Sequence, residues 1–169
     1  DNIVYSKDMT RLLMISPNYE GELIIPQSVT AMDTFAALRC KKLTRVVIPE
    51  GVTKIATGAF EDCTGLTAVS IPEGVTVIED HAFYGCTGLT EITIPDSVIQ
   101  VGFRALRGCD NLESVVLPFV GETENGSVNS HVGFVFGART YGGNISFVPE
   151  GLKQLIIKRG TLQKNALYG

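Results

Sequence analysis

The chain has 169 residues, a net charge of −4 and four cysteines, and 44% of its residues are hydrophobic. Its 14 basic and 18 acidic residues are interspersed, so no basic cluster is suited to follow a phosphate backbone and we expect no nucleic-acid partner. No apolar stretch approaches the roughly 20 residues that a membrane-spanning helix needs, so we expect no membrane insertion by this chain.

Residues 1–24 are predicted to form a β-hairpin that leads into the first strand of a repeat. Ile3–Tyr5 and Leu12–Ile15 consist of residues that favour strands, and the polar segment between them is suited to a turn. A turn at Ser16–Asn18 follows, and Glu22–Ile25 is expected to be the first solenoid strand. The sequence therefore predicts two antiparallel strands ahead of a repetitive region.

Residues 25–117 are predicted to form four regular repeats of equal length. Three residue types recur at one constant spacing: Pro26, Pro49, Pro72, Pro95 and Pro118; Cys40, Cys63, Cys86 and Cys109; Leu43, Leu66, Leu89 and Leu112. A period of about 23 residues with a leucine-spaced strand is typical of a leucine-rich-repeat solenoid. We expect a single α/β-repeat domain over residues 1–169, wound right-handed. Each coil should have one short parallel strand, with a short helical turn around its Ala-Phe pair on the opposite side.

The period is interrupted after Pro118. Leu117 and Ile157 hold equivalent strand positions but lie much more than one period apart, which predicts a long coil with an insertion over residues 118–151. Within this coil, Phe134 and Phe136 are expected to take the buried aromatic positions. Residues 152–169 read as a partial last repeat. Because the chain starts and stops inside recognisable modules, we expect it to be a fragment of a longer protein.

The repeat unit Leu-Thr-x-Ile-x-Ile-Pro-x-x-Val-Thr-x-Ile-x-x-x-Ala-Phe-x-x-Cys-x-x-Leu resembles the BspA-like leucine-rich repeat of bacterial cell-surface proteins. The resemblance implies export to the cell surface or the extracellular space. It also implies binding to host or microbial proteins or glycans, without catalysis. We expect no cofactor and no metal. The residues themselves specify neither a ligand nor an oligomeric state.

The four cysteines occupy one repeat position and should stack as a column along the solenoid. Four cysteines in an exported chain are also compatible with disulfides, and a metal site is a third reading. Metal sites favour close pairs such as Cys-x-x-Cys, which are absent here. A structural column of small buried side chains is therefore the favoured interpretation.

Two candidate binding surfaces follow from the repeat pattern. The outward strand positions should line a concave sheet, the usual extended binding surface of solenoids, although these side chains are equally compatible with a merely solvated strand surface. The outward positions are Glu22, Ile24, Arg45, Val47, Ala68, Ser70, Glu91, Thr93, Ser114, Val116, Gln154 and Ile156. The candidate binding residues among them are Glu22, Arg45, Val47, Ser70, Glu91, Thr93, Ser114, Val116 and Gln154. The second candidate is a group in the insertion that could bind a partner or only hold the long loop in place: Phe119, Arg139, Tyr141 and Phe147.

The leading functional prediction is a non-enzymatic recognition or adhesion module for host or microbial macromolecules. One alternative is a passive spacer that holds another domain away from the cell. The least favoured alternative is a hydrolase that uses a cysteine or His131, because no nucleophile elbow or oxyanion-hole motif accompanies these residues.

Overall fold

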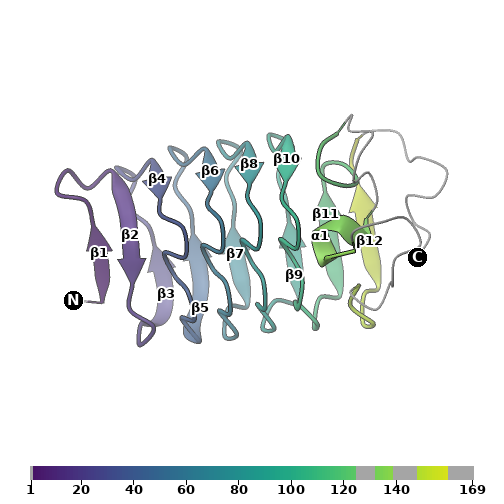
Figure 1. Cartoon of the computed structure of the whole chain (residues 1–169), viewed down its shortest axis with the longest axis horizontal. Helices are drawn as coiled ribbons and strands as arrows, with labels where there is room; N and C mark the ends of the chain where they lie inside the picture. Colours follow the sequence, from purple (N-terminus) through teal and green to yellow (C-terminus); the bar gives the residue numbers. More distant parts are fainter. Residues whose placement is uncertain (1, 125–131, 139–147, 160–169) are drawn as a thin grey trace.

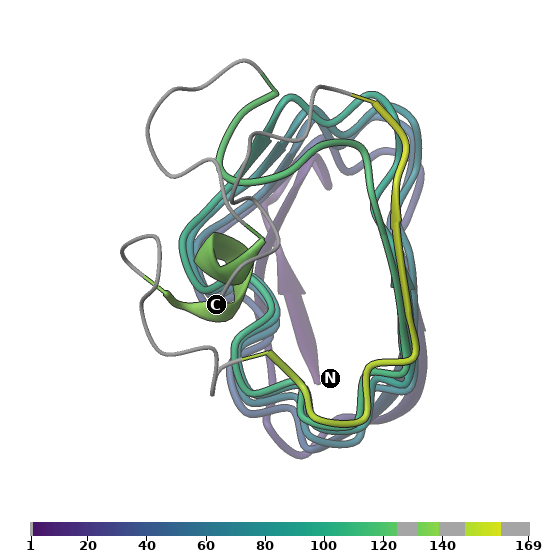
Figure 2. The ribbon, with the colours of Figure 1, turned by 90° about the vertical axis from the view of Figure 1, so that its right-hand side faces the viewer.

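The computed structural model describes residues 2–124, 132–138 and 148–159, and it is a β-solenoid of about five stacked coils. The coils nearly superimpose when viewed along the stack (Figure 2), and the chain advances from one end to the other without doubling back between coils (Figure 1). The strands are β1 (Ile3–Tyr5), β2 (Arg11–Ile15), β3 (Glu20–Ile24), β4 (Ala31–Met32), β5 (Lys42–Val47), β6 (Lys54–Ile55), β7 (Ala68–Ser70), β8 (Val77–Ile78), β9 (Glu91–Thr93), β10 (Gln100–Val101), β11 (Ser114–Leu117) and β12 (Gln154–Ile157).

The N-terminal segment forms the expected hairpin. Strands β1 and β2 pair antiparallel, with Ile3 opposite Ile15, and β2 then pairs parallel with β4. The hairpin thus joins the solenoid through its second strand. Leu12 and Ile15 are buried, which places the inner face of β2 on the same core as the repeats.

The longer strands form one wall of the solenoid, in two parallel sheets ordered β3-β5-β7 and β9-β11-β12. Leucine and branched residues point into the core from this wall, as the period predicts; Leu43 and Val46 are fully buried examples. The backbone ladder is interrupted between β7 and β9. On β7 the inward-facing Val69 is only partly buried, and so is the following Ile71.

A second wall consists of the two-residue strands β4, β6, β8 and β10, which the sequence interpretation of one strand per coil omitted. Strands β6, β8 and β10 pair in parallel, with Lys54 opposite Val77 and Val77 opposite Gln100. The second residue of each short strand points inward together with a valine three residues earlier. These apolar pairs were predicted, and all are buried: Val29 and Met32, Val52 and Ile55, Val75 and Ile78, Val98 and Val101.

The expected helical turns around the Ala-Phe pairs are not present; each of these segments is an irregular turn. Its N–H groups bond alternately within the coil and to the next coil. For example, Cys86 donates to the Phe83 carbonyl at 3.3 Å, whereas Phe83 donates to Ala105 of the next coil at 3.0 Å. Half of the donors that a helix needs are therefore used between coils. The hand of the winding remains a prediction.

Helix α1 (Gly133–Phe136) is the only helix within the described residues, and it takes the place of a turn in the long coil. Leu106 donates to the carbonyl of Val135 at 2.9 Å, which continues the ladder of the turn side. Phe134 and Phe136 are buried as predicted, with exposed fractions of 5% and 0%. Deeper in the stack, the rings of Phe60 and Phe83 are parallel, with centroids 5.5 Å apart.

The chain reverses direction after β11. Thr123 forms an antiparallel bridge with Gln100, and Val101 donates to the Glu122 carbonyl at 2.9 Å. The short-strand wall therefore continues past β10 with an antiparallel segment, whereas the long-strand wall continues in parallel with β12.

Candidate binding surfaces

The long-strand face consists of the outward side chains of β3, β5, β7, β9, β11 and β12. All nine residues predicted for this surface lie on it, in two rows set by strand register. The first row is Glu22, Arg45, Ala68, Glu91, Ser114 and Gln154; the second is Ile24, Val47, Ser70, Thr93, Val116 and Ile156. Each row is divided by the ladder interruption between β7 and β9.

Charged groups on the long-strand face pair sideways between coils. Arg45 Nε lies 3.2 Å from Glu22 Oε1, and Lys153 Nζ lies 2.9 Å from Glu113 Oε1. These side chains are about half exposed or more, so such pairs contribute little to stability. Glu91 has no ion-pair partner among the described residues. A partner would thus meet largely neutralised charge, with the carboxylate of Glu91 available near the middle of the face.

The second row carries two exposed isoleucines at its ends. Ile24 is 65% exposed and Ile156 is 41% exposed, although each lies on a regular strand beside a valine of the same row. The sequence predicted both isoleucines as outward strand positions, although the candidate binding residues chosen from that face were their neighbours Val47 and Val116. The strand register confirms this placement, because Ile24 aligns with Val47 and Ile156 aligns with Val116.

The predicted site in the insertion is only partly described. Phe119 is buried, with 2% of its surface exposed, and the guanidinium carbon of Arg159 lies 6.0 Å from its ring centroid. Arg159 also bonds to the Val98 carbonyl at 2.7 Å and pairs with Glu124 at 3.2 Å. Phe119 therefore packs inside the long coil instead of facing solvent. The remaining three residues lie outside the described part, as does His131: Arg139, Tyr141 and Phe147.

The four cysteines are buried and free, and they form the predicted column. Each thiol also donates to a carbonyl of the preceding coil; Cys86 Sγ lies 3.1 Å from Phe60 O, and Cys109 Sγ lies 3.1 Å from Phe83 O. Burial raises the pKa of Cys86 and raises that of Cys109 to about 12. Contact with the Cys40 thiol, together with burial, raises the pKa of Cys63. Because only a thiolate is a nucleophile, these three cysteines are unsuited to catalysis.

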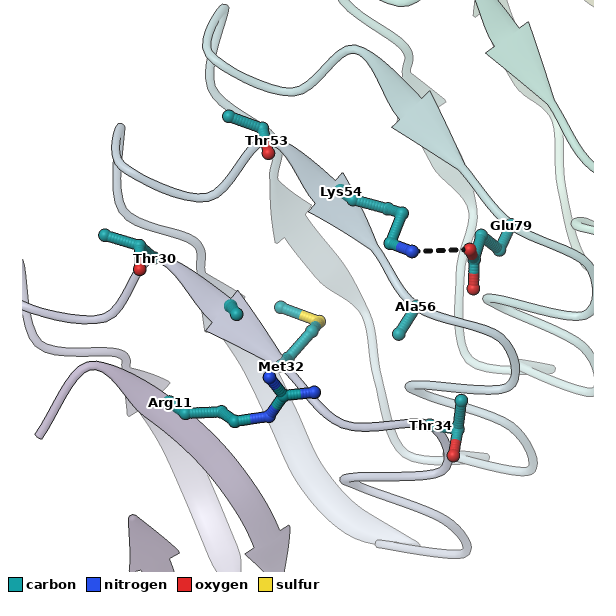
Figure 3. Close-up of a pocket in the computed structure, with 9 residues that line it drawn as sticks. Arg11, Thr30, Met32, Thr34, Thr53, Lys54, Ala56 and Glu79 are labelled. Carbon is teal, nitrogen blue, oxygen red and sulfur yellow. Dashed lines mark ion pairs between the residues drawn. The ribbon is translucent and has the colours of Figure 1, made fainter. Parts of the chain in front are cut away.

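A pocket of about 260 Å³ opens on the short-strand wall, on the opposite side of the coils from the long-strand face. We call it the β4–β6 pocket, and its lining is drawn in Figure 3. The lining residues are Arg11, Thr30, Ala31, Met32, Thr34, Thr53, Lys54, Ala56 and Glu79. No residue of this pocket was predicted as part of a site, because the position of the pocket depends on a local change in strand pairing and not on a residue motif.

Two ion pairs border the β4–β6 pocket. Arg11 pairs through Nε with Asp33, and Lys54 Nζ lies 2.8 Å from Glu79 Oε1. The second oxygen of Glu79 accepts hydrogen bonds of 2.9 Å from the backbone N–H and the hydroxyl of Thr57. The ion pair with Lys54 lowers the pKa of Glu79, and the bonds from Thr57 act in the same direction. The carboxylate of Glu79 is thus fully engaged and holds Lys54 in place.

Two further classes of site are absent from the part of the chain that the structure describes. No group of three or more His, Cys, Asp or Glu side chains is arranged to hold a metal ion there. Nor does that part contain a helix long and apolar enough to cross a membrane.

Residues 20–127 match the family model described as the BspA type leucine rich repeat region, in six copies. The chain belongs to the BspA type leucine-rich-repeat family. The resemblance inferred from the repeat unit is therefore confirmed. The family suggests a protein-interaction module, and its solenoid typically serves as a non-enzymatic scaffold. No curated protein matches the chain.

Three solved structures illustrate the relationship. The pneumococcal vaccine antigen PcpA matches 98% of this chain and 38% of its own length, with 24% identity and a TM-score of 0.77. A leucine rich cell surface protein from Faecalibacterium prausnitzii is 43% identical over 54% of this chain and 24% of its own, with a TM-score of 0.52. The T. pallidum leucine rich repeat protein is 21% identical over 91% of this chain and 78% of its own, with a TM-score of 0.57. The chain thus spans well under half of the first two relatives.

Proposed function

We propose that this chain is a non-enzymatic recognition module of a bacterial protein exported to the cell surface, and that it binds a protein partner through the long-strand face. Membership of the BspA type family supports a role in protein interaction. The 43% identity with a cell surface protein supports the location. The partner belongs to the host or to another microbe, and the binding is adhesive rather than catalytic.

The observation that carries this proposal is the pair of exposed apolar patches at the two ends of the second row, Ile24 with Val47 and Ile156 with Val116. Strand side chains that face water are usually polar, yet Ile24 is 65% exposed and aligns with Val47 on the next coil. Burying one such side chain at an interface stabilises a complex by roughly 1.5–3 kcal/mol, and polar neighbours then set its orientation. The mixed row of Glu22, Arg45 and Glu91 supplies these polar neighbours.

A binding assay with a matched control tests the proposal. The parent chain and two variants are applied to immobilised extracellular-matrix proteins and mucins. Ile24→Lys places a charge on the long-strand face, whereas Ile99→Lys places the same charge at an isoleucine of similar exposure, 57%, next to β10 on the other wall. We expect saturable binding by the parent chain, its loss in Ile24→Lys, and its retention in Ile99→Lys.

The other outcomes contradict the proposal in different ways. Equal binding by both variants would move the interface away from the long-strand face. The absence of saturable binding by the parent chain would favour the spacer function instead. A circular-dichroism spectrum of each variant establishes that any loss of binding is not a loss of fold.

A further inference from the structure

The backbone ladder of the short-strand wall is interrupted at the β4–β6 pocket. Elsewhere on this wall the bond repeats from coil to coil: Thr30 N–H donates to Thr10 O at 2.8 Å, and Thr76 N–H donates to Thr53 O at 2.8 Å. The corresponding bond from Thr53 N–H to Thr30 O is missing, and β4 and β6 belong to different sheets. The backbones of the coils that carry β4 and β6 are therefore not hydrogen-bonded to each other at this place, although the coils of β6, β8 and β10 are.

A second bond is missing at the same place. Glu79 N–H donates to Ile55 O at 2.9 Å and Asp33 N–H donates to Leu12 O at 2.9 Å, but the equivalent N–H of Ala56 has no partner among the described residues. Neither does its expected acceptor, the Met32 carbonyl. Ala56 is only 3% exposed. An unpaired backbone N–H of a buried residue lowers the stability of the fold unless water or a ligand forms a hydrogen bond with it.

The unpaired groups offer both donors and acceptors to the pocket. Two N–H groups come from Thr53 and Ala56, and two carbonyls come from Thr30 and Met32; all four residues line the pocket. A hydroxyl group can donate and accept at once, so a ligand with several hydroxyls matches such a wall. The volume of about 260 Å³ exceeds the roughly 30 Å³ that one water occupies, which leaves room for a ring of monosaccharide size.

The charges at the pocket favour a ligand that carries a carboxylate. Arg11 uses Nε for Asp33, which leaves its two terminal nitrogens available as a fork for a carboxylate. Figure 3 shows this side chain extending from β2 toward Met32 on β4. Lys54 is a second cation at the border, and Glu79, the only acidic lining residue, is occupied by Lys54 and Thr57.

We propose that the β4–β6 pocket binds an acidic sugar, with its hydroxyls on the open backbone ladder and its carboxylate on Arg11. This site lies on the opposite wall from the long-strand face, so it would add glycan recognition to the protein interaction proposed above. The two proposals can fail independently, since Ile24→Lys leaves this pocket intact.

Amide chemical shifts of the full chain test the site, with sodium D-glucuronate as the ligand and D-glucose and sodium acetate as controls. We expect saturable shifts of the Thr53 and Ala56 amides with glucuronate, while the Thr76 and Glu79 amides, which are paired in the ladder, move little. Glucose should bind more weakly because it lacks the carboxylate. Acetate should give no saturable shift at the same concentrations because it lacks the hydroxyls.

Variants make the test specific. Arg11→Ala should weaken glucuronate binding about tenfold, the loss of one charge-assisted fork. Lys153→Ala removes a similarly paired, exposed lysine from the opposite wall and should leave binding unchanged. The amide spectra of both variants should remain dispersed, which shows that they fold.

Three results would overturn the proposal: no saturable shift with glucuronate, an equal response to acetate, or unchanged binding in Arg11→Ala. The methyl glycoside of glucuronate distinguishes the source of the sugar. Its binding would assign the pocket to the terminal residue of an acidic glycan, and its failure beside binding of glucuronate would assign it to the free acid. Each of these last two results supports an acidic-sugar site.

Discussion

The Sγ atom of Cys63 lies 3.0 Å from the carbonyl oxygen of Ala37, which belongs to the preceding coil. The same carbonyl accepts the backbone N–H of Cys40 at 3.2 Å. Each thiol thus does more than fill space, because it adds a side-chain hydrogen bond between coils at a place where the backbone bond stays within one coil. This arrangement leads to two predictions about the thiols.

Native thiols should not react with Ellman's reagent, and four should react after denaturation. All four cysteines are fully buried, so the reagent reaches them only when coils open. Interaction with the neighbouring Cys63 thiol lowers the pKa of Cys40, so Cys40 should be the first to react when denaturant is raised. Mass spectrometry of partially labelled protein identifies the site. Fewer than four thiols in denaturant would instead indicate disulfides.

Stability should fall as the solution becomes alkaline. A cysteine in an unfolded chain titrates near pH 8.5, whereas the pKa of Cys109 in the fold is raised to about 12 by burial. Below about pH 8.5 the protonated thiol makes its full contribution to the free energy of unfolding. That contribution falls by about 1.4 kcal/mol per pH unit as the pH rises from there toward about 12, because the unfolded chain loses the proton first. Urea unfolding at pH 8 to 9.5, below the range of tyrosine, measures the decline. Cys109→Ala should decline less steeply, and equal slopes would refute this explanation.

Phe83→Ala should destabilise the fold by about 3–5 kcal/mol, because the ring is fully buried and stacks on Phe60. Phe83→Leu should cost much less, since Leu106 occupies the same position in the next coil. The matched control is Phe35→Ala, whose ring is 45% exposed and lies against Gly58. Urea midpoints rank the three variants. Similar losses for Phe35→Ala and Phe83→Ala would contradict the assigned core.

Two positions in each turn have a left-handed backbone. One of them is occupied by Gly108 in one coil and by Asp62 in another, so substitutions at these two residues should have opposite effects on stability. Gly108 has φ +75°, so Gly108→Ala should cost roughly 1 kcal/mol. Asp62 holds the equivalent position with φ 58° and pairs only weakly with Arg39, at 3.6 Å. Asp62→Gly should therefore be neutral or slightly stabilising. Thermal unfolding measures both, and a large loss in Asp62→Gly would reveal a role for its carboxylate that the ion pair does not explain.

The sequence predicted the part of this fold that depends on periodicity. Inward residues such as Leu43 and Val52, the thiol column, and every residue predicted for the long-strand face are found where the repeat period puts them. The short strands were missed because two residues show no alternation from which a strand could be inferred. The helical turns were wrong because hydrogen bonds between coils compete with those of a helix, and residue types alone do not show which will form.

The β4–β6 pocket could not be predicted for a different reason. Its lining residues, such as Thr30 and Thr53, occur at equivalent repeat positions, and Thr76 has the same place in the next coil without a comparable interruption of the ladder. What distinguishes the pocket is the pairing of β4 with the hairpin on one side only. This one-sided pairing of β4 is set by how the coils stack on one another and not by the type of any single residue.

The antiparallel bridge between Gln100 and Thr123 has a consequence for how such a chain can lengthen. A duplicated unit of one full period inserted between the coils of β6, β8 and β10 would meet parallel ladders on the short-strand wall on both its faces, because these coils pair with one another in one register. A unit inserted directly after Thr123 would meet a segment that runs antiparallel to the short strands of the regular coils. Gene duplication can therefore extend this module from within its paired repeats, whereas the antiparallel segment at Thr123 offers no parallel ladder to a new unit on that wall.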